Sequence, residues 1–217
     1  MDLIQALAAE LGKDPRHVEN VVHLLDEGNT IPFIARYRKE LHGAMDDTSL
    51  RTLEERLQYL RGLEERREAV KKSIDEQGKL TDELAAAIDS AKTLAEVEDL
   101  YRPYKQKRRT RATMAKEKGL EPLAALLFAQ ERDCPRPEEA ARDFVDPEKG
   151  VETVEDALQG ASDIIAEQIS DDAAIRKSLR ALISRQGQLV SRAATEDDSV
   201  YRLYYDFTQS VARLQGH

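Results

Sequence analysis

Apolar residues recur every three or four positions along most of the chain, which is the spacing that predicts amphipathic helices. In residues 1–47 this pattern is interrupted at Gly12 and again at Gly28, so it predicts three short helices joined by tight turns. Such a unit is either a helix-turn-helix or a plain three-helix bundle, because only side chains that reach a nucleic-acid groove make it a DNA reader. Asp14 and Thr30 are expected to cap the second and third helices. The third helix is expected to turn these residues inward: Phe33, Ile34 and Tyr37.

The longest predicted helix runs from about Ser49 to Gln77, with Asp47 or Thr48 as its cap. Its apolar residues form one narrow stripe, made of Leu50, Leu53, Leu57, Leu60, Leu63, Val70 and Ile74. Arg67 interrupts this stripe, whereas a free coiled coil needs a sustained series of apolar heptads. The stripe therefore predicts a seam that packs against other helices of the same chain.

Capping residues and apolar spacing predict further helices as far as Gly187. Their expected starting points are Thr81, Thr93, Thr113, Leu120, Pro137, Thr153 and Asp172. Thr93 and Glu96 have the spacing of a capping box, in which each side chain satisfies a free backbone donor near the other. The helix from Leu120 to Gln130 is nearly all apolar, so it is expected to be central.

From Gln188 onward the helical pattern is lost. Residues 188–194 fit a short strand, and residues 199–207 fit a helix or a strand equally well. The predicted fold class is therefore all-α: a multi-helix array with an N-terminal helix-turn-helix-like unit, one long central helix and one possible short strand near 188–194. We expect three parts, namely residues 1–47, residues 48–132 with the long helix, and a C-terminal helical part at 133–217.

The composition fits a helical protein whose outer faces are charged and exposed to solvent, because 41% of residues are apolar, 35% are charged and only 5% are aromatic. A single cysteine excludes a disulfide within the chain and suits a reducing compartment. No apolar run approaches the ~18 residues of a membrane-spanning helix, and the N-terminus lacks the features of a secretory signal, so we expect a cytoplasmic location without membrane contact. The net charge of −9 argues against general binding to nucleic acid. Any such binding must be local.

One local exception is the stretch from Tyr101 to Arg111, which we call the basic connector. It contains six cations and no acid: Arg102, Lys105, Lys107, Arg108, Arg109 and Arg111. Pro103 argues against an uninterrupted helix here, because proline lacks a backbone donor. Two interpretations stay open: the cations bind phosphates brought by a ligand, or they pair with carboxylates of the chain itself. A second basic group lies on the third helix: Arg36, Arg38 and Lys39.

Catalytic motifs are not found in the sequence. There is no phosphate-binding glycine loop, no His-Glu-x-x-His and no Gly-x-Ser-x-Gly. The histidine spacings do not indicate a metal site. Three pairs of adjacent aspartates are expected to cap helices or turns, since neighbouring side chains diverge: Asp46-Asp47, Asp171-Asp172 and Asp197-Asp198. We therefore expect no enzyme, no catalytic residue, no metal and no cofactor.

Four blocks of sequence together resemble a known family. They are residues 31–40 (IPFIARYRKE), 53–60 (LEERLQYL), 98–112 (EDLYRPYKQKRRTRA) and 119–124 (GLEPLA). In this order they are similar to the N-terminal region of the Tex family, which are bacterial transcription accessory proteins. The sparser pattern from Gly160 to Phe207 is also similar, so the resemblance covers nearly the whole chain. His42, Ala44 and Met45 depart from the threonine-glycine loop that the family has there.

The resemblance implies a helical scaffold that begins with a helix-turn-helix-like unit and works with nucleic acid in transcription, similar to a eukaryotic elongation factor. It also implies that an RNase-H-like domain, helix-hairpin-helix elements and an OB-fold RNA-binding domain follow, so the chain is expected to be a fragment. The main nucleic-acid contacts are then expected in the OB-fold.

Two functions remain as hypotheses. The first is a non-catalytic scaffold of a transcription-associated protein that binds RNA or DNA, weakly in this fragment, and contacts the transcription machinery. Its candidate phosphate-binding residues are Arg36, Arg38, Lys39, Arg102, Lys105, Lys107, Arg108, Arg109 and Arg111. The second is a protein-interaction scaffold, in which the basic connector docks on an acidic partner or on another domain of the full-length protein.

Overall fold

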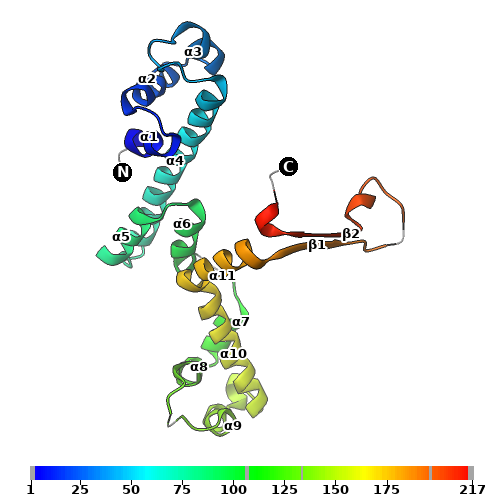
Figure 1. The fold of residues 1–217 in the computed structure, drawn as a ribbon. Helices are drawn as coiled ribbons and strands as arrows, with labels where there is room; N and C mark the ends of the chain where they lie inside the picture. Colours follow the sequence, from blue (N-terminus) through cyan, green and yellow to red (C-terminus); the bar gives the residue numbers. More distant parts are fainter. Residues whose placement is uncertain (1–2, 106–107, 133, 196, 215–217) are drawn as a thin grey trace. The chain divides into compact units, whose positions relative to one another are not determined.

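The computed structural model describes residues 3–105, 108–132, 134–195 and 197–214. The chain is mostly helical with one two-stranded sheet, which confirms the predicted fold class (Figure 1). It forms two compact units, Met1–Val97 and Glu98–His217. The predicted three-part division, with boundaries after residues 47 and 132, stays a prediction.

The first unit is built on one long helix. Helices α1 (Leu3–Leu11), α2 (Pro15–Asp26) and α3 (Ile31–Tyr37) lie against the first half of α4 (Asp47–Asp75), as Figure 1 shows. Helix α5 (Asp82–Ser90) folds back against the end of α4, and α6 (Leu94–Tyr101) begins in this unit. Side chains from α1 to α4 share one apolar core. This core sets how α3 is rotated.

The predicted stripe of α4 is confirmed as a buried seam. Six of its seven members are buried: Leu50, Leu53, Leu57, Leu63, Val70 and Ile74. The cap is Asp46, not Asp47 or Thr48 as predicted, because the Asp46 carboxylate accepts the Ser49 N–H at 2.8 Å. The helix therefore begins one to two residues earlier than its apolar pattern indicates.

Arg67 occupies a buried position of the seam, with only 2% of its surface exposed. Its guanidinium donates to the Glu64 carboxylate at 2.6 Å and to the Ala91 carbonyl at 2.5 Å. Ala91 caps the C-terminus of α5, so this side chain joins α4 to the end of the next helix. The interruption of the stripe is thus a polar link between two helices.

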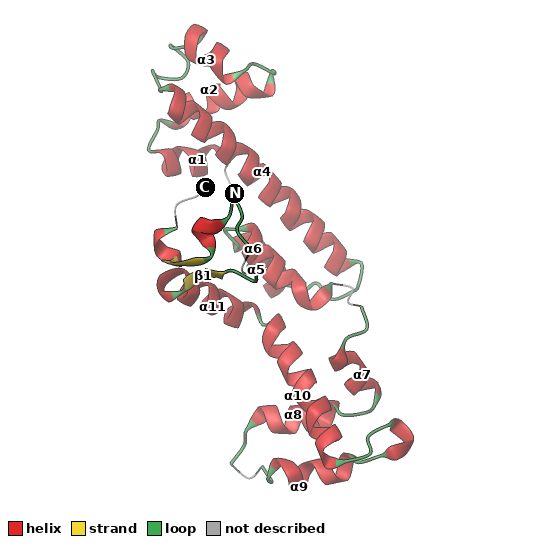
Figure 2. Cartoon of the chain, turned by 90° about the vertical axis from the view of Figure 1, so that its right-hand side faces the viewer, coloured by secondary structure: helices red, strands yellow, loops and turns green. Residues whose placement is uncertain are grey.

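The second unit has its own core. Helix α10 (Val154–Asp171) packs against α7 (Arg111–Glu117), α8 (Glu121–Ala129) and α9 (Pro137–Ala141), as Figures 1 and 2 both show. At Gly160 of α10 an added Cβ would lie 2.3 Å from Leu120 Cδ1 and 3.3 Å from Ala115 Cβ, so any larger residue there would force the Leu120 side chain to move. Short 3₁₀ turns complete the chain: Arg102–Tyr104, Arg142–Phe144, Pro147–Lys149, Arg202–Tyr204 and Val211–Arg213.

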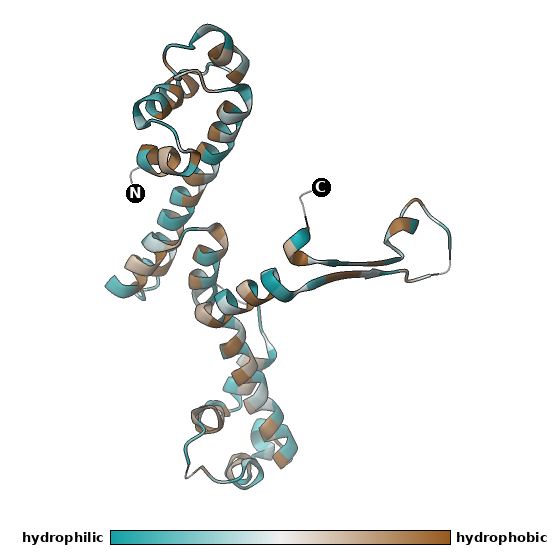
Figure 3. Ribbon diagram, in the orientation of Figure 1, coloured by the Kyte–Doolittle hydropathy of each residue, from teal (hydrophilic) through white to brown (hydrophobic). Residues whose placement is uncertain are grey.

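After α10 come α11 (Ala173–Gln186) and a β-hairpin. Strand β1 (Gln188–Arg192) confirms the predicted strand and pairs antiparallel with β2 (Asp206–Ser210), with Val190 opposite Thr208. The ambiguous segment 199–207 contains a 3₁₀ turn and then the start of β2. Helix α11 leaves its apolar residues 37–55% exposed: Ile175, Leu179, Leu182 and Ile183. Figure 3 colours the ribbon of α11 by hydropathy.

Three local expectations were wrong. Tyr37 does not face inward, because 56% of its surface is exposed. Thr30 precedes α3 but its side chain makes no capping hydrogen bond. The apolar run of α8 buries only Leu123 and Ala124, while Phe128 is 52% exposed. For Tyr37 and Phe128, the orientation of the helix decides which apolar side chains are buried, and apolar character alone does not predict it.

Within the described ranges, no helix combines the length and hydropathy that crossing a bilayer requires.

Replacing Arg67 by alanine should lower the free energy of unfolding of the first unit by about 2–4 kcal/mol, because it removes a buried side chain and leaves the Ala91 carbonyl unpaired. Urea unfolding followed by circular dichroism measures this. Lys72→Ala, an exposed cation on the same helix, is the control and should cost less than about 1 kcal/mol. Equal costs for the two variants would show that the Arg67 link is not important for stability.

Candidate nucleic-acid interface

The α3 cations Arg36, Arg38 and Lys39 lie at the C-terminal end of their helix. Ile31 and Ile34 are almost fully buried in the core and fix the helix rotation. With 3.6 residues per turn, this rotation turns Arg36 outward. Lys39, beyond the end of the helix, is exposed, and Arg38 is half-buried at the C-cap.

None of these three cations forms an ion pair with a residue that the structure describes. Instead, the Arg36 guanidinium lies 6.0 Å from the centre of the Tyr37 ring, and that of Arg38 lies 5.2 Å from the centre of the Phe33 ring. Arg38 Nη1 also donates to the Tyr37 carbonyl at 3.1 Å. The aromatic rings thus position the two guanidinium groups without neutralising them, and the positive charge stays available to an external anion.

The basic connector differs, because three of its described cations already face carboxylates. Arg102 pairs with Asp171 at 2.9 Å, Arg109 pairs with Glu117 at 2.6 Å, and Lys105 pairs with Glu98. The Lys105–Glu98 and Arg109–Glu117 pairs are exposed on both sides, so each contributes little to stability, and a phosphate could replace its carboxylate at small cost. The Asp171 side chain is only 14% exposed, so the pair that it forms with Arg102 costs more to break.

The remaining connector cations divide into two groups. Arg108 and Arg111 are exposed and form no ion pair within the described part of the chain. Arg111 is the first residue of α7, which Thr110 caps through the Thr113 N–H. Lys107 lies outside the described residues. The structure therefore separates the predicted phosphate-binding residues into two groups, on α3 of the first unit and in the connector of the second.

Sequence reasoning missed a buried carboxylate next to the connector. Asp99 on α6 is only 4% exposed, and its two oxygens accept hydrogen bonds from Arg176 (2.5 Å) and Arg180 of α11. Burial raises the pKa of this carboxyl, but the hydrogen bonds from Arg180 and Arg176 outweigh burial and hold the pKa below its usual range. The sequence signal was the i,i+4 spacing of the two arginines, although nothing in the sequence named their partner.

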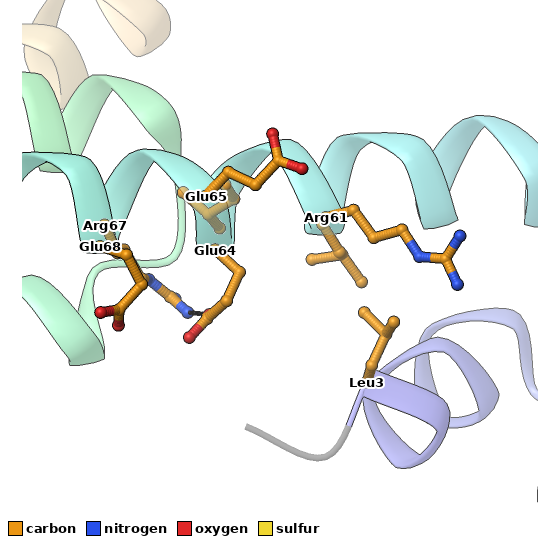
Figure 4. Close-up of a pocket in the computed structure, with 8 residues that line it drawn as sticks. Leu3, Arg61, Glu64, Glu65, Arg67 and Glu68 are labelled. Atoms are coloured by element: carbon orange, nitrogen blue, oxygen red, sulfur yellow. Dashed lines mark hydrogen bonds and ion pairs between the residues drawn. The ribbon is translucent and has the colours of Figure 1, made fainter.

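A pocket of about 610 Å³ lies on α4, but it does not suit phosphate. Figure 4 shows Leu3 of α1 opposite the α4 side chains that line it. Three of these are glutamates at its rim, Glu64, Glu65 and Glu68, which repel anions. The described residues also contain no group of three side chains that could hold a metal ion.

The sequence matches two family models, the Tex-like protein N-terminal domain over residues 1–75 and the Tex central region over residues 133–217. The chain belongs to the Tex family. It is 48% identical to "Protein YhgF" of Escherichia coli and 43% identical to "Transcriptional accessory protein Tex" of Neisseria gonorrhoeae, over 97% and 100% of this chain. It is 29% identical over its full length to "S1 RNA-binding domain-containing protein 1" of Homo sapiens.

The Tex relatives are much longer than this chain, which spans 27%, 28% and 22% of these three proteins. The predicted resemblance is confirmed, and the chain corresponds to one part of these relatives, one of which is named a transcriptional accessory protein. Nucleic-acid binding by its own residues is a separate question, because the RNA-binding domain in the name of the human relative belongs to that protein.

Asp99→Ala should lower the free energy of unfolding at pH 7 by about 2–4 kcal/mol, because two charge-assisted hydrogen bonds are lost. The pKa of Asp99 is depressed in the folded state, so its contribution is complete above the unfolded value of about 3.9 and is lost as the pH falls below it. The difference between the two proteins should therefore shrink below about pH 4.

Hydrogen exchange of α6 and α11, measured between pH 3 and 7, follows this difference locally. The exposed Asp143→Asn serves as the control and should leave both helices unchanged. A difference that stays constant across this pH range would contradict a charge-based role for Asp99.

Proposed function

We propose that this chain is a non-catalytic helical segment through which a cytoplasmic, transcription-associated Tex protein contacts the phosphates of RNA or DNA. The observation that supports this proposal is the α3 group of cations, Arg36, Arg38 and Lys39, none of which pairs with a described carboxylate. In a chain with 42 acidic and 33 basic residues, such a group marks where an external anion is attracted.

The connector supplies a second, weaker group of contacts in this proposal. Arg108 and Arg111 bind phosphate first, and Arg102, Lys105 and Arg109 join by exchanging their carboxylate partners. Lys107 is included as a phosphate-binding cation because of its place in the sequence of the connector.

The geometry of α3 favours phosphate contact over base readout. A recognition helix reads bases with its N-terminal residues, which lie in the major groove. Here Ile31 is buried and Pro32 carries no hydrogen-bonding side chain, so the first turn offers no donor to a base edge. The cations lie at the opposite end of the helix, where they bind a nucleic-acid backbone without reading its sequence.

A protein-interaction scaffold is the second candidate function. The exposed apolar residues of α11 favour it, because soluble proteins rarely leave a continuous apolar helix face open. Its signature is partner binding that survives nuclease treatment.

Fluorescence anisotropy with labelled RNA and DNA oligonucleotides at several salt concentrations tests the proposed function. With about five phosphates contacted, the logarithm of the affinity should fall with the logarithm of the salt concentration at a slope of about −4. The triple variant Arg36→Gln, Arg38→Gln, Lys39→Gln should reduce the magnitude of this slope by about 2 to 3.

A control variant with the same loss of charge is Lys72→Gln, Lys79→Gln, Lys92→Gln, since all three lysines are exposed in the same unit. It should keep the original slope. Absence of salt-dependent binding in the unmodified chain would overturn the proposed function, and equal slopes for the two triple variants would remove α3 from it.

A further inference from the structure

The outer face of α3 carries two aromatic rings as well as the three cations. Phe33 and Tyr37 are one helical turn apart, with ring centroids 5.3 Å apart and planes inclined by 47°. Phe33 is half-buried, and more than half of Tyr37 is exposed. We call Phe33, Tyr37, Arg36, Arg38 and Lys39 together the aromatic–cation surface.

Folding alone does not account for this surface. The core contacts of α3 come from Ile31 and Ile34, with the partly buried Ala35 packed beside them, and neither Phe33 nor Tyr37 belongs to that core. An aromatic pair at i,i+4 stabilises a helix only slightly, and this effect does not require the ring of Tyr37 to be open to solvent. Nor does it require neighbouring cations that lack carboxylate partners.

The same combination of groups is what proteins use to hold single-stranded nucleic acid. Aromatic rings stack on unpaired bases, and nearby cations follow the backbone. In a duplex the bases are already stacked on one another and leave no face for a protein ring. An exposed Tyr37 ring beside the Arg36 guanidinium, with that of Arg38 over the neighbouring Phe33 ring, therefore distinguishes single strands from duplexes by chemistry, whatever their sequence.

The angle between the Phe33 and Tyr37 rings limits how a base can stack on them. Because their planes differ by 47°, one flat base cannot lie parallel to both rings. The more exposed ring, Tyr37, takes the base, and Phe33 supports it from its half-buried position. Arg36 and Lys39, both exposed, then face the phosphates on either side of that nucleotide.

We propose that the aromatic–cation surface binds single-stranded nucleic acid by stacking one unpaired base on Tyr37 while the α3 cations hold the flanking phosphates. This inference rests on the proposed function and adds to it the class of nucleic acid and the residue that selects it.

The experiment compares three ligands of equal length for the 217-residue chain: a single-stranded oligonucleotide, its duplex, and an abasic strand that keeps every phosphate. The normal single strand should bind about 5- to 100-fold more tightly than the abasic strand. Tyr37→Leu should lose most of this advantage and keep the salt dependence, since leucine preserves an apolar contact with Phe33 but has no ring. Tyr37→Phe should retain the advantage, because the ring remains.

A base analogue supplies a spectroscopic signature that a structural role for Tyr37 would not give. The fluorescence of 2-aminopurine in the single strand should be quenched on binding to the unmodified chain and to Tyr37→Phe, but not to Tyr37→Leu. Tyr201→Leu is the matched control, because Tyr201 is 67% exposed elsewhere in the chain, and it should leave both quenching and affinity unchanged.

Equal affinity for normal and abasic strands, with salt dependence retained, would overturn the stacking inference and leave the proposed function in place. Loss of salt-dependent binding to all three ligands would overturn the proposed function itself. Competition by a polyglutamate peptide as strong as that of the single strand would also overturn the inference, since it would show a general anion site. If Tyr37→Leu does not fold, the comparison of normal and abasic strands, together with Tyr37→Phe, still tests whether a base stacks on the ring.

Discussion

The burial of Ile31 and Ile34 against the seam of α4 is the contact on which the candidate interface depends. Each buried isoleucine contributes about 1.5–3 kcal/mol, and together they permit only one rotation of a seven-residue helix. Once that rotation is set, the helical period turns Arg36 and Tyr37 to solvent. Hydrophobic packing thus creates a charged and aromatic surface that the packing itself does not use.

Electrostatics then separates the cations of this acidic chain into two kinds. Most cations that form ion pairs within the described ranges face a carboxylate on the protein surface, where the pair contributes between nothing and about 1 kcal/mol. Two buried charges differ from these and stabilise the fold: Asp99, held by Arg176 and Arg180, and Arg67, held by Glu64 and the Ala91 carbonyl. The α3 cations belong to neither kind, since none pairs with a described carboxylate; rings and a carbonyl hold Arg36 and Arg38, and Lys39 is exposed. Arg36 and Arg38 thus combine full charge with a defined position.

Periodicity and capping chemistry were enough to predict most of the fold. The seam of α4, the caps at Asp14, Thr81 and Asp172, and the strand at 188–192 follow from local sequence, where one or two turns of chain decide the structure. Long-range partners could not be predicted. Asp99 meets arginines 77 and 81 residues away, and Arg102 meets Asp171 across 69 residues, so only the folded chain brings them together.

The cations of the candidate site could be predicted from local sequence, but its aromatic part could not. The sequence named Arg36, Arg38 and Lys39, because a cluster of cations is visible in one dimension. It placed Tyr37 in the core, because an aromatic residue in an apolar helix normally packs inward. The sequence also placed Ile34 in the core, which is correct, but only the structure shows that Ile31 joins it there and that Tyr37 is exposed beside the cations.

Photocrosslinking of a 4-thiouridine-labelled single strand, followed by mass spectrometry, tests the central claim most directly, because it identifies the residues that touch a base. The account predicts crosslinks at Tyr37 and its neighbours on α3, which disappear when excess unlabelled single strand is added. Crosslinks confined to the basic connector, or found only outside residues 31–40, would contradict it.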